Sequence, residues 1–355
     1  MCVDQEAFPI SVTHWQRAHG RHALPWQRTR DPYRVWLSEV MLQQTQVSTV
    51  LGYYEKFLAR CPDVAALAAA PEDEVLGLWS GLGYYSRARN LHRCAQAVVR
   101  DHGGAFPRSA QVLQTLPGIG RSTAAAIAAF CFGERVAILD GNVKRVLARV
   151  LAFGDDLASS AAEKRLWALA QARVPAHSDD MPAYTQGLMD LGATICLPRK
   201  PDCAACPVQA LCAARAQGNP LAYPVKTRRL RRTAQSLWLL QAMREDGAVW
   251  LEKRPPRGVW AGLYSLPVFE SREALARALA PARMSAAHLQ DGDPFVHVLT
   301  HKDLHLHPVR VAWPRRRPAE PVTAERTSAA RWVGPEEWPS LGLPAPVRRL
   351  LDAGA

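Results

Sequence analysis

The spacing of apolar residues predicts a run of helices in the first two thirds of the chain. From about Asp31 to Arg215, apolar residues recur three and four positions apart, which is the period of a helix with one buried face. Proline and glycine interrupt the pattern between segments, and no stretch alternates strongly enough to predict a strand. The clearest helical segments are Tyr33–Gln43, Val47–Ala59, Pro71–Trp79, Ser86–Val99 and Ala161–Ala172.

After Ala234 the pattern changes to alternation between apolar and polar residues. Two pairs of alternating segments flank short polar turns, and each pair predicts a β-hairpin. Two further segments have a helical period. The hairpins are Ser236–Met243 with Ala248–Arg254 and Phe295–Thr300 with Leu304–Trp313, and the helices are Ser271–Ala280 and Ala345–Asp352.

These patterns predict a mainly α fold with a separate α+β region at the end. A chain of 355 residues is long enough for two domains of roughly 150 residues each. We expect a helical region over residues 1–218, a basic linker over 219–233 and an α+β domain over 234–355. The linker's five basic residues are consistent with a solvated hinge and equally with a hinge that faces phosphates. They are Lys226, Arg228, Arg229, Arg231 and Arg232.

The formal net charge of +12 favours a polyanionic partner, because excess positive charge gives sequence-independent affinity for phosphates. Met1–Ile10 does not have the basic start and apolar run of a secretory signal. The longest apolar stretch, Thr123–Phe132, is far too short to span a membrane. We therefore expect a cytoplasmic protein with no membrane partner.

Four of the eight cysteines are clustered with metal-ligand spacing. Cys196, Cys203, Cys206 and Cys212 form the pattern C-x6-C-x2-C-x5-C. Four thiolates satisfy the ligand count of a tetrahedral zinc ion and of an Fe4S4 cluster. Zinc sites usually pair two Cys-x-x-Cys motifs across a longer span, so the single motif here favours one [4Fe-4S] cluster held by one loop.

Two carboxylates and one glycine-rich turn are candidate functional groups. Gly118 and Gly120 lie in a Pro-Gly-x-Gly turn between two helical segments, where free N–H groups could bind a phosphate; an ordinary helical corner would look the same. Asp140 precedes a helical segment, the usual place of an N-cap. Glu39 stands in a nearly all-apolar helical turn, and burial there would raise its pKa toward that of a general acid.

Taken together, these motifs resemble the endonuclease III superfamily of DNA glycosylases. The shared order is a helix–hairpin–helix, then a distal aspartate, then the four-cysteine loop. The segments around Glu39, Tyr84 and Asp140 resemble the adenine DNA glycosylase (MutY-type) branch of that superfamily. These segments are Trp36-Leu37-Ser38-Glu39-Val40-Met41-Leu42-Gln43-Gln44-Thr45-Gln46-Val47, Gly81-Leu82-Gly83-Tyr84-Tyr85 and Leu139-Asp140-Gly141-Asn142-Val143-Lys144-Arg145.

The resemblance implies excision of adenine that is paired with 8-oxoguanine or guanine in double-stranded DNA. The target base would be flipped into a pocket and its N-glycosidic bond hydrolysed through an oxocarbenium-like transition state. Glu39 would protonate the adenine, Asp140 would stay ionised and stabilise the sugar, and Asn142 would assist Asp140. The resemblance also implies that one chain acts as a monomer.

Ser122 occupies the position at which lyase members of the superfamily carry a lysine. A serine cannot form a Schiff base, so we expect a monofunctional glycosylase that leaves an abasic site. Lys144 is a nearby amine, and we expect it to contact a phosphate or lie on the helix surface. The other implied contacts with DNA come from the hairpin and from two residues that would wedge into the base stack. They are Gly118, Gly120, Arg121 and Ser122, with Gln44 and Tyr84 as the wedge.

The end of the chain resembles the Nudix-like module with which the adenine branch senses 8-oxoguanine. A Nudix hydrolase needs Arg-Glu-x-x-Glu-Glu to hold Mg²⁺, but Ala276 and Arg277 stand at the last two acidic positions, which disfavours hydrolysis by this module. The family's lesion-reading Phe-Ser-His is Leu299-Thr300-His301 here, so Thr300 and His301 are the expected readers.

Two other functions fit part of this pattern. A bifunctional glycosylase for pyrimidine lesions shares the hairpin and the cysteine loop, but Ser122 and the extra module argue against it. A non-enzymatic iron–sulfur redox protein would explain the cysteines alone, but would need neither the hairpin nor the segment around Glu39.

Overall fold

A computed structural model of the chain describes residues 6–227, 231–282, 284, 286–314 and 329–354. By its internal contacts the chain divides into two compact units. The first comprises Met1–Ala69 and Asn90–Arg229, and the second comprises Ala70–Arg89 and Leu230–Ala355. Arg228 and Arg229 of the expected linker lie outside the described residues.

The regular elements before Thr233 are all helices within the described residues, as the apolar spacing predicts. The predicted segments correspond to α2, α3, α5, α6 and α10. Across this part of the chain the helices are α1 (Ala7–His19), α2 (Pro32–Leu42), α3 (Val47–Arg60), α4 (Val64–Ala69), α5 (Glu72–Leu78), α6 (Ser86–His102), α7 (Ala110–Leu113), α8 (Arg121–Phe132), α9 (Gly141–Val150), α10 (Ser160–Gln171), α11 (Met181–Asp190) and α12 (Ala213–Ala216).

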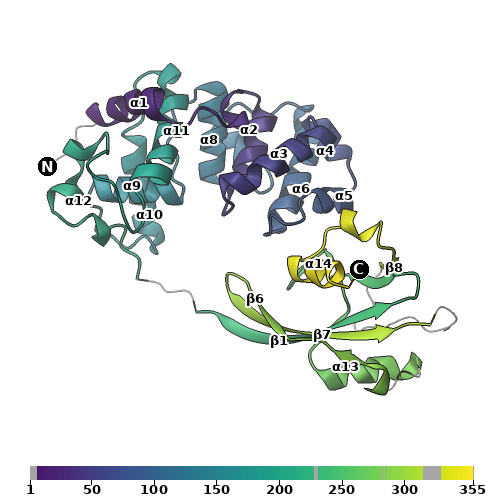
Figure 1. The fold of residues 1–355 in the computed structure, drawn as a ribbon. Helices are drawn as coiled ribbons and strands as arrows, with labels where there is room; N and C mark the ends of the chain where they lie inside the picture. The colour runs from purple at the N-terminus through teal and green to yellow at the C-terminus, as the bar shows by residue number, and fades with distance from the viewer. Residues whose placement is uncertain (1–5, 228–230, 283, 285, 315–328, 355) are drawn as a thin grey trace. The chain divides into compact units, whose positions relative to one another are not determined.

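Helix α8 lies at the centre of the first unit, with α2 on one side and α11 on the other (Figure 1). All six residues from Ala124 to Ala129 are buried, and five of them are alanine. Small side chains let neighbouring helices approach closely, so this one helix contacts α2, α7 and α11. The helix that carries Glu39 is thereby packed onto the helix that follows the glycine-rich turn.

A second core of the first unit connects α9 to the cysteine loop. Val143, Val146 and Leu147 of α9 are buried together with Leu188 of α11, and Cys196, Cys206 and Cys212 pack against this core. Helix α11 continues at Leu191–Ile195 as one π-helical turn that leads directly into Cys196. Such turns are rare and are frequently found at functional sites.

The second unit contains one mixed sheet with the strand order β3-β2-β1-β7-β5, to which β4, β6 and β8 pair at the sides. Both predicted hairpins are present, as β1 with β2 and β6 with β7. The centre of the sheet is a parallel pair, β1 with β7, in register from Thr233–Lys302 to Met243–Ala312. The strands are β1 (Thr233–Met243), β2 (Val249–Lys253), β3 (Tyr264–Ser265), β4 (Val268–Phe269), β5 (Gln290–Asp291), β6 (Phe295–Val298), β7 (Lys302–Ala312) and β8 (Ala330–Val333).

Alternation along β1 places its side chains in two different cores. Leu239 packs with Val347 of α14 (Ala345–Asp352) on one face of the sheet, and Leu240 packs with Leu275 of α13 (Arg272–Leu279) on the other. The two helices cover opposite faces of the sheet (Figure 1). This α+β arrangement is the one predicted from the sequence.

The segment Ala70–Arg89 packs as part of the second unit. A methyl group at Gly77 would overlap the carbonyl oxygen of Ser340, so the contact requires glycine. The hydroxyl of Tyr85 donates to the carbonyl oxygen of Leu343 at 2.7 Å, and Arg348 donates to the hydroxyl of Ser80 at 3.1 Å. The turn that carries Tyr84 is thereby fixed to the sheet domain.

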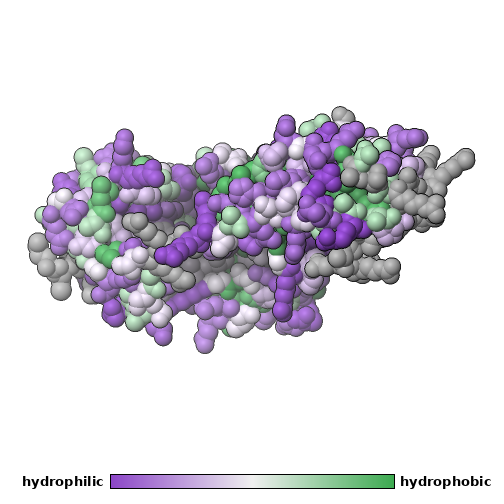
Figure 2. Space-filling model, turned by 90° about the horizontal axis from the view of Figure 1, so that it is seen from below, coloured by the Kyte–Doolittle hydropathy of each residue, from purple (hydrophilic) through white to green (hydrophobic). Residues whose placement is uncertain are grey.

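On the face drawn in Figure 2, hydrophilic side chains predominate and apolar ones lie in small, separate patches. Among the described helices, none combines the length and the apolar character that crossing a membrane requires.

Candidate active site

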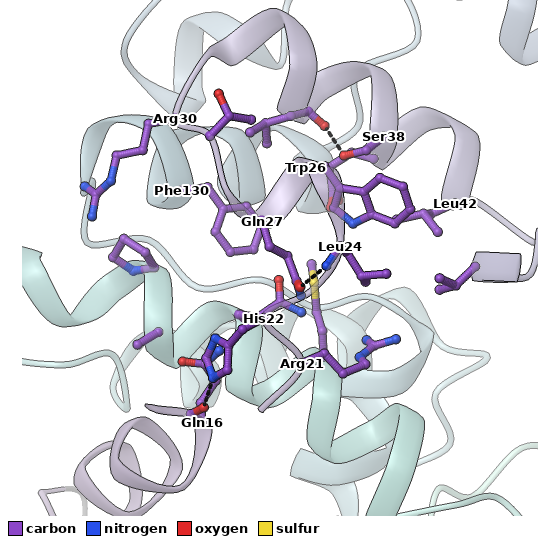
Figure 3. Close-up of a pocket in the computed structure, with 18 residues that line it drawn as sticks. Gln16, Arg21, His22, Leu24, Trp26, Gln27, Arg30, Ser38, Leu42 and Phe130 are labelled. Atoms are coloured by element: carbon purple, nitrogen blue, oxygen red, sulfur yellow. Dashed lines mark hydrogen bonds between the residues drawn. The ribbon is translucent and has the colours of Figure 1, made fainter. Parts of the chain in front are cut away.

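Glu39 lies in the wall of a cavity of about 280 Å³ in the first unit. Helix α2 begins with Asp31 as its N-cap, whose carboxylate accepts from the Tyr33 N–H at 3.0 Å. The helix buries Trp36, Leu37 and Met41 and leaves Glu39 at the edge of the cavity. Figure 3 shows the side chains that line it, among them Trp26, Phe130, Arg30 and His22.

The surroundings of Glu39 oppose its ionisation. Burial, and after it the negative charge of Asp140, together raise the pKa of Glu39 to about 8. The carboxyl group is therefore mostly protonated at neutral pH. A half-buried proton donor at the wall of a cavity can act as a general acid toward a group that enters the cavity.

Asp140 is the N-cap of α9, and its carboxylate accepts from the Val143 N–H at 2.7 Å. Burial raises the pKa of Asp140, whereas the N–H groups of Val143 and Asn142 and the charges of Arg145 and Lys144 lower it. No N–H donor and no basic side chain is among the groups that shift the pKa of Glu39. The pKa of Asp140 is on balance still raised, but unlike Glu39 it has neighbours that favour its anion, so the two carboxyls differ in environment.

Ser122 lies next to the segment that carries Asp140. Its hydroxyl oxygen accepts from the Leu139 N–H at 3.2 Å, one residue before Asp140. The first turn of α8 and the start of α9 are thereby joined. The structure thus places Asp140 within electrostatic range of Glu39, and Ser122 against the residue that precedes Asp140.

Asn142 and Lys144 have partners within the protein. The side-chain oxygen of Asn142 accepts from Arg145 at 3.0 Å, and its Cβ leaves no space for a side chain at Gly192. Lys144 forms an ion pair with Glu163 at 2.6 Å. The amine of Lys144 is therefore engaged in an ion pair between α9 and α10.

The glycine-rich turn between α7 and α8 requires glycine at one position. Gly118 has a φ of +76°, and a side chain there would meet Cβ of Asn90 at 2.5 Å. Gly120 is the N-cap of α8 and a side chain there would meet open space. The first N–H groups of α8 are thus exposed to an anion, and Arg121 lies beside them, 4.0 Å above the Trp167 ring.

The four clustered cysteines line one small cavity behind α9. Burial, with smaller contributions from the charges of the other three cysteines, raises the pKa of Cys206 to about 11, so the four groups interact. Among the residues that the structure describes, no three His, Cys, Asp or Glu side chains lie close enough together to hold a metal ion. Arg199 and Lys200 are exposed on the same loop.

Gln44 and Tyr84, the two expected wedge residues, share an uncommon backbone conformation. Their φ values are +58° and +47°, in the left-handed region that residues other than glycine rarely adopt. Gln44 is exposed, and Tyr84 exposes 47% of its surface. Strained, exposed polar residues of this kind cluster at functional sites.

Tyr84 and Thr300 meet in the second unit. The two hydroxyl groups are 2.9 Å apart, and both residues line a cavity of about 630 Å³ together with His301, Trp260 and His297. Thr300 and His301 are exposed at the tip of the β6–β7 hairpin. The hairpin tip is thereby joined to the turn of Tyr84.

Sequence reasoning missed Asp190 at the cavity of Glu39. Asp190 is fully buried, and its carboxylate accepts from the Arg21 N–H at 2.9 Å, from Arg21 Nε at 2.7 Å and from Gln186 at 2.8 Å. Arg21 and Gln186 both line the cavity. A single acid inside the apolar run Leu188–Gly192 is the signal that could have indicated a buried partner.

Two protein families match parts of this chain. The HhH-GPD superfamily of base excision DNA repair proteins matches residues 37–172, and the NUDIX domain matches residues 239–353. The adenine DNA glycosylase of Buchnera aphidicola subsp. Acyrthosiphon pisum (strain APS) is 33% identical over 345 residues, which cover 97% of each chain. The human adenine DNA glycosylase is 35% identical over 407 residues, covering 97% of this chain and 73% of the human protein.

Solved structures resemble the helical part. A thermostable thymine-DNA glycosylase matches 60% of this chain and 97% of its own, with 30% identity and a TM-score of 0.54. Endonuclease III in a non-covalent complex with DNA matches the same shares with 20% identity and a TM-score of 0.50, a likeness of fold.

Proposed function

The chain belongs to the adenine DNA glycosylase family and is a hydrolase of N-glycosyl bonds in DNA, and we propose that its substrate is adenine paired with 8-oxoguanine or guanine. One observation carries the proposal. A glutamic acid whose pKa is raised to about 8 lines a cavity in the helical unit and interacts with a second carboxyl group. Two carboxyls in different environments are what hydrolysis through an oxocarbenium-like transition state requires.

Glu39 acts as the general acid. Adenine is a poor leaving group as an anion, so a proton delivered to N7 lets it depart as a neutral base. The raised pKa keeps that proton on Glu39 at neutral pH. After the base has left, the carboxylate of Glu39 can accept a proton from the water that attacks the sugar.

Asp140 stabilises the sugar cation. The two N–H groups and two basic side chains that favour its anion allow it to stay ionised while Glu39 is protonated. Its place at the start of α9, one residue from the N–H held by Ser122, fixes its position. Asn142, bonded to Arg145, assists from the first turn of α9 and not as a second acid.

The reaction stops at the abasic site. Forming a Schiff base requires an amine beside the sugar carbon. Ser122 supplies a hydroxyl group at the position next to Asp140, and the amine of Lys144 is paired with Glu163. We therefore propose a monofunctional enzyme.

Cys196, Cys203, Cys206 and Cys212 would hold one [4Fe-4S] cluster. They line one cavity, and a cluster is wider than a single ion, so its ligands stand further apart than those of zinc. When bound, such a cluster would order the loop that holds it. The loop would then present Arg199 and Lys200 to DNA phosphates, and the N-terminus of α8 with Gly118, Gly120 and Arg121 would be a second site that binds the DNA backbone.

Lesion recognition is the role of the second unit. Tyr84 carries a flat ring for the base stack and is bonded to Thr300, and His301 adds a donor at the same tip. Gln44 enters the stack from the helical unit. Each hydrogen bond that these residues form with the oxidised base would favour 8-oxoguanine over guanine.

We also propose that the enzyme acts as a monomer in the cytoplasm. All the residues assigned to the chemistry and to lesion reading belong to one chain. The clustered thiols need a reducing compartment, because an oxidising one would convert them to disulfides.

A duplex assay tests this function. Purified protein is incubated with duplexes that carry adenine opposite 8-oxoguanine, guanine or thymine, and strand breaks are counted with and without alkali. We expect abasic sites in the first two duplexes only, and breaks only after alkali. Breaks without alkali, or equal action on the A:T duplex, would contradict the proposal.

A further inference from the structure

Arg149 is a charged residue buried against the cysteine loop. It lies on α9 and exposes 2% of its surface. Its guanidinium group donates to carbonyl oxygens at the start of the loop and to others in the chain after it. The acceptors are Leu197 at 2.7 Å, Pro198 at 3.0 Å, Cys196 at 3.4 Å, Pro220 at 2.9 Å and Tyr223 at 3.2 Å.

The same residue touches two of the four clustered cysteines. Nη1 of Arg149 donates to Sγ of Cys196 at 3.3 Å, and the carbonyl oxygen of Arg149 accepts from the thiol of Cys212 at 3.5 Å. These two cysteines are the first and the last of the four. One arginine therefore spans the loop that all four ligands share.

The charge of Arg149 has no carboxylate partner in the ion pairs of the described residues. A second arginine, Arg145, also donates to the carbonyl oxygen of Cys196, at 2.8 Å, so a like charge lies nearby. Buried charges are normally paired, because desolvation is costly. Four thiolates around an iron–sulfur core carry a net negative charge, which is the partner that this arginine would have.

We propose that Arg149 is the counter-cation of the cysteine loop, a positioning residue that holds the loop closed and places a fixed positive charge against the Cys196 sulfur. The inference rests on the proposed cluster. The planar guanidinium group of Arg149 has five N–H donors and reaches two separate segments at once, which the single ammonium group of a lysine cannot do. Hydrogen bonds to ligand sulfurs also set the reduction potential of iron–sulfur clusters.

The test uses three variants of the full-length protein as purified. Arg149→Lys keeps the charge but loses the fork, and Arg149→Met loses both. Arg173→Lys is the matched control, because Arg173 is also buried (5%) but donates to Leu169, outside the loop. Far-UV circular dichroism, iron content, the half-life of the visible absorbance in a chelator and the reduction potential are measured for each.

We expect both Arg149 variants to keep their helical signal and to lose iron at least about tenfold faster than wild type, the usual effect of removing a residue that orients metal ligands. The reduction potential of Arg149→Met should shift to more negative values, while Arg149→Lys shifts less and Arg173→Lys matches wild type. Iron loss at the wild-type rate, an unchanged potential in Arg149→Met, or equal effects in Arg173→Lys would overturn the proposal.

Two outcomes separate this inference from the proposed function. Wild-type protein that excises adenine but contains no iron would overturn the role of Arg149 and leave the excision intact. Wild-type protein that holds iron, with the expected loss in the Arg149 variants but no action on the A:8-oxoguanine duplex, would support Arg149 and overturn the substrate.

Discussion

Glu39 keeps its proton at neutral pH because the site is poorly solvated and because a second carboxyl group lies nearby. Burial and the charge of Asp140 both act on Glu39 in the direction of the neutral acid. Burial also raises the pKa of Asp140, but hydrogen bonds from N–H groups and the charges of two basic side chains act against it. The same pair of residue types thus supplies one acid and one anion because their neighbours differ.

Glu39→Gln should abolish most base excision while leaving DNA affinity unchanged. The amide fills the same space but cannot deliver a proton, and general acids typically contribute about 100- to 10,000-fold to the rate. Single-turnover rates on the A:8-oxoguanine duplex measure the loss. Glu55→Gln, an exposed substitution on α3, is the control. A variant that excises at nearly the wild-type rate would remove Glu39 from the role of acid.

The rate should depend on pH with a maximum between two limbs. Activity requires Glu39 protonated and Asp140 ionised, so the rate rises as Asp140 loses its proton. It then falls as pH passes about 8, where Glu39 loses its own. Because the carboxyls interact, both apparent pKa values belong to the pair. The alkaline limb should be absent from the residual activity of Glu39→Gln, and its persistence there would assign it to another group.

Ser122→Lys should produce strand breaks without alkali. Ser122 is bonded to Leu139, the residue before Asp140. A lysine at position 122 would therefore place an amine near Asp140, where it can form a Schiff base with the sugar. Borohydride trapping measures the covalent complex. Ser122→Ala is the control, since it also removes the acceptor of the Leu139 N–H but adds no amine. Equal trapping in wild type and Ser122→Lys would mean that residue 122 does not face the sugar.

At the scale of elements, the helix–hairpin–helix depends on one left-handed glycine. Gly118→Ala would place a Cβ against that of Asn90 and force a conformation that costs about 1–2 kcal/mol in residues other than glycine. We expect a lower Tm and weaker binding to nonspecific duplex DNA. Gly154→Ala is the control, because a side chain there meets open space at an ordinary φ. A Gly118→Ala protein with unchanged Tm and affinity would show that the turn adapts.

Elements with a clear period could be predicted from the sequence, and long-range partners could not. The period of three and four located α2 and α6 to within a few residues, because each helix has one apolar face. The parallel pairing of β1 with β7 joins strands that are far apart in the chain, and alternation carries no information on the partner. The contact of Arg149 with Cys196 could not be predicted for the same reason, because the two residues are far apart in the chain.

The residues of the candidate site likewise fall into two groups, those that the sequence identifies and those that it does not. Glu39, Asp140, Ser122 and the cysteines carry recognisable local sequence. The left-handed backbone of Gln44 and Tyr84 has no local signal, since neither is glycine. The tie between Asp190 and Arg21 depends on the packing of α11 against the N-terminal segment, which no periodicity encodes.

At the scale of the whole molecule, Tyr84 and the expected lesion readers Thr300 and His301 belong to one compact unit, whereas Gln44 belongs to the other. The segment Ala70–Arg89 comes early in the chain but packs with the sheet domain, through Gly77, Tyr85 and Ser80. The sequence predicted a single helical region over residues 1–218, because its helical period continues through this segment. The sheet domain therefore packs with Ala70–Arg89, a segment that we propose to form part of the DNA-reading surface.

Deleting everything after Thr233 should lower the preference for 8-oxoguanine over guanine by tenfold or more. The deletion removes Thr300 and His301, and a good contact to a base is worth about 1–3 kcal/mol of discrimination. Glu39, Asp140 and Ser122 all remain, so excision from an A:G mispair should continue. Because Ala70–Arg89 loses its packing partner, the truncated protein should also have a lower Tm.

Thr300→Val separates these two effects of the deletion. It removes only the hydroxyl group that is bonded to Tyr84 and lies at an exposed hairpin tip, so the Tm should stay at the wild-type value. The ratio of single-turnover rates on A:8-oxoguanine and A:G should nevertheless fall, because both the contact to the lesion and the position of Tyr84 are lost. If the ratio is unchanged in Thr300→Val and in the truncated protein, the helical region reads the lesion alone. If it falls only after truncation, either His301 makes the contact to the lesion or the sheet domain acts by holding Ala70–Arg89 in place.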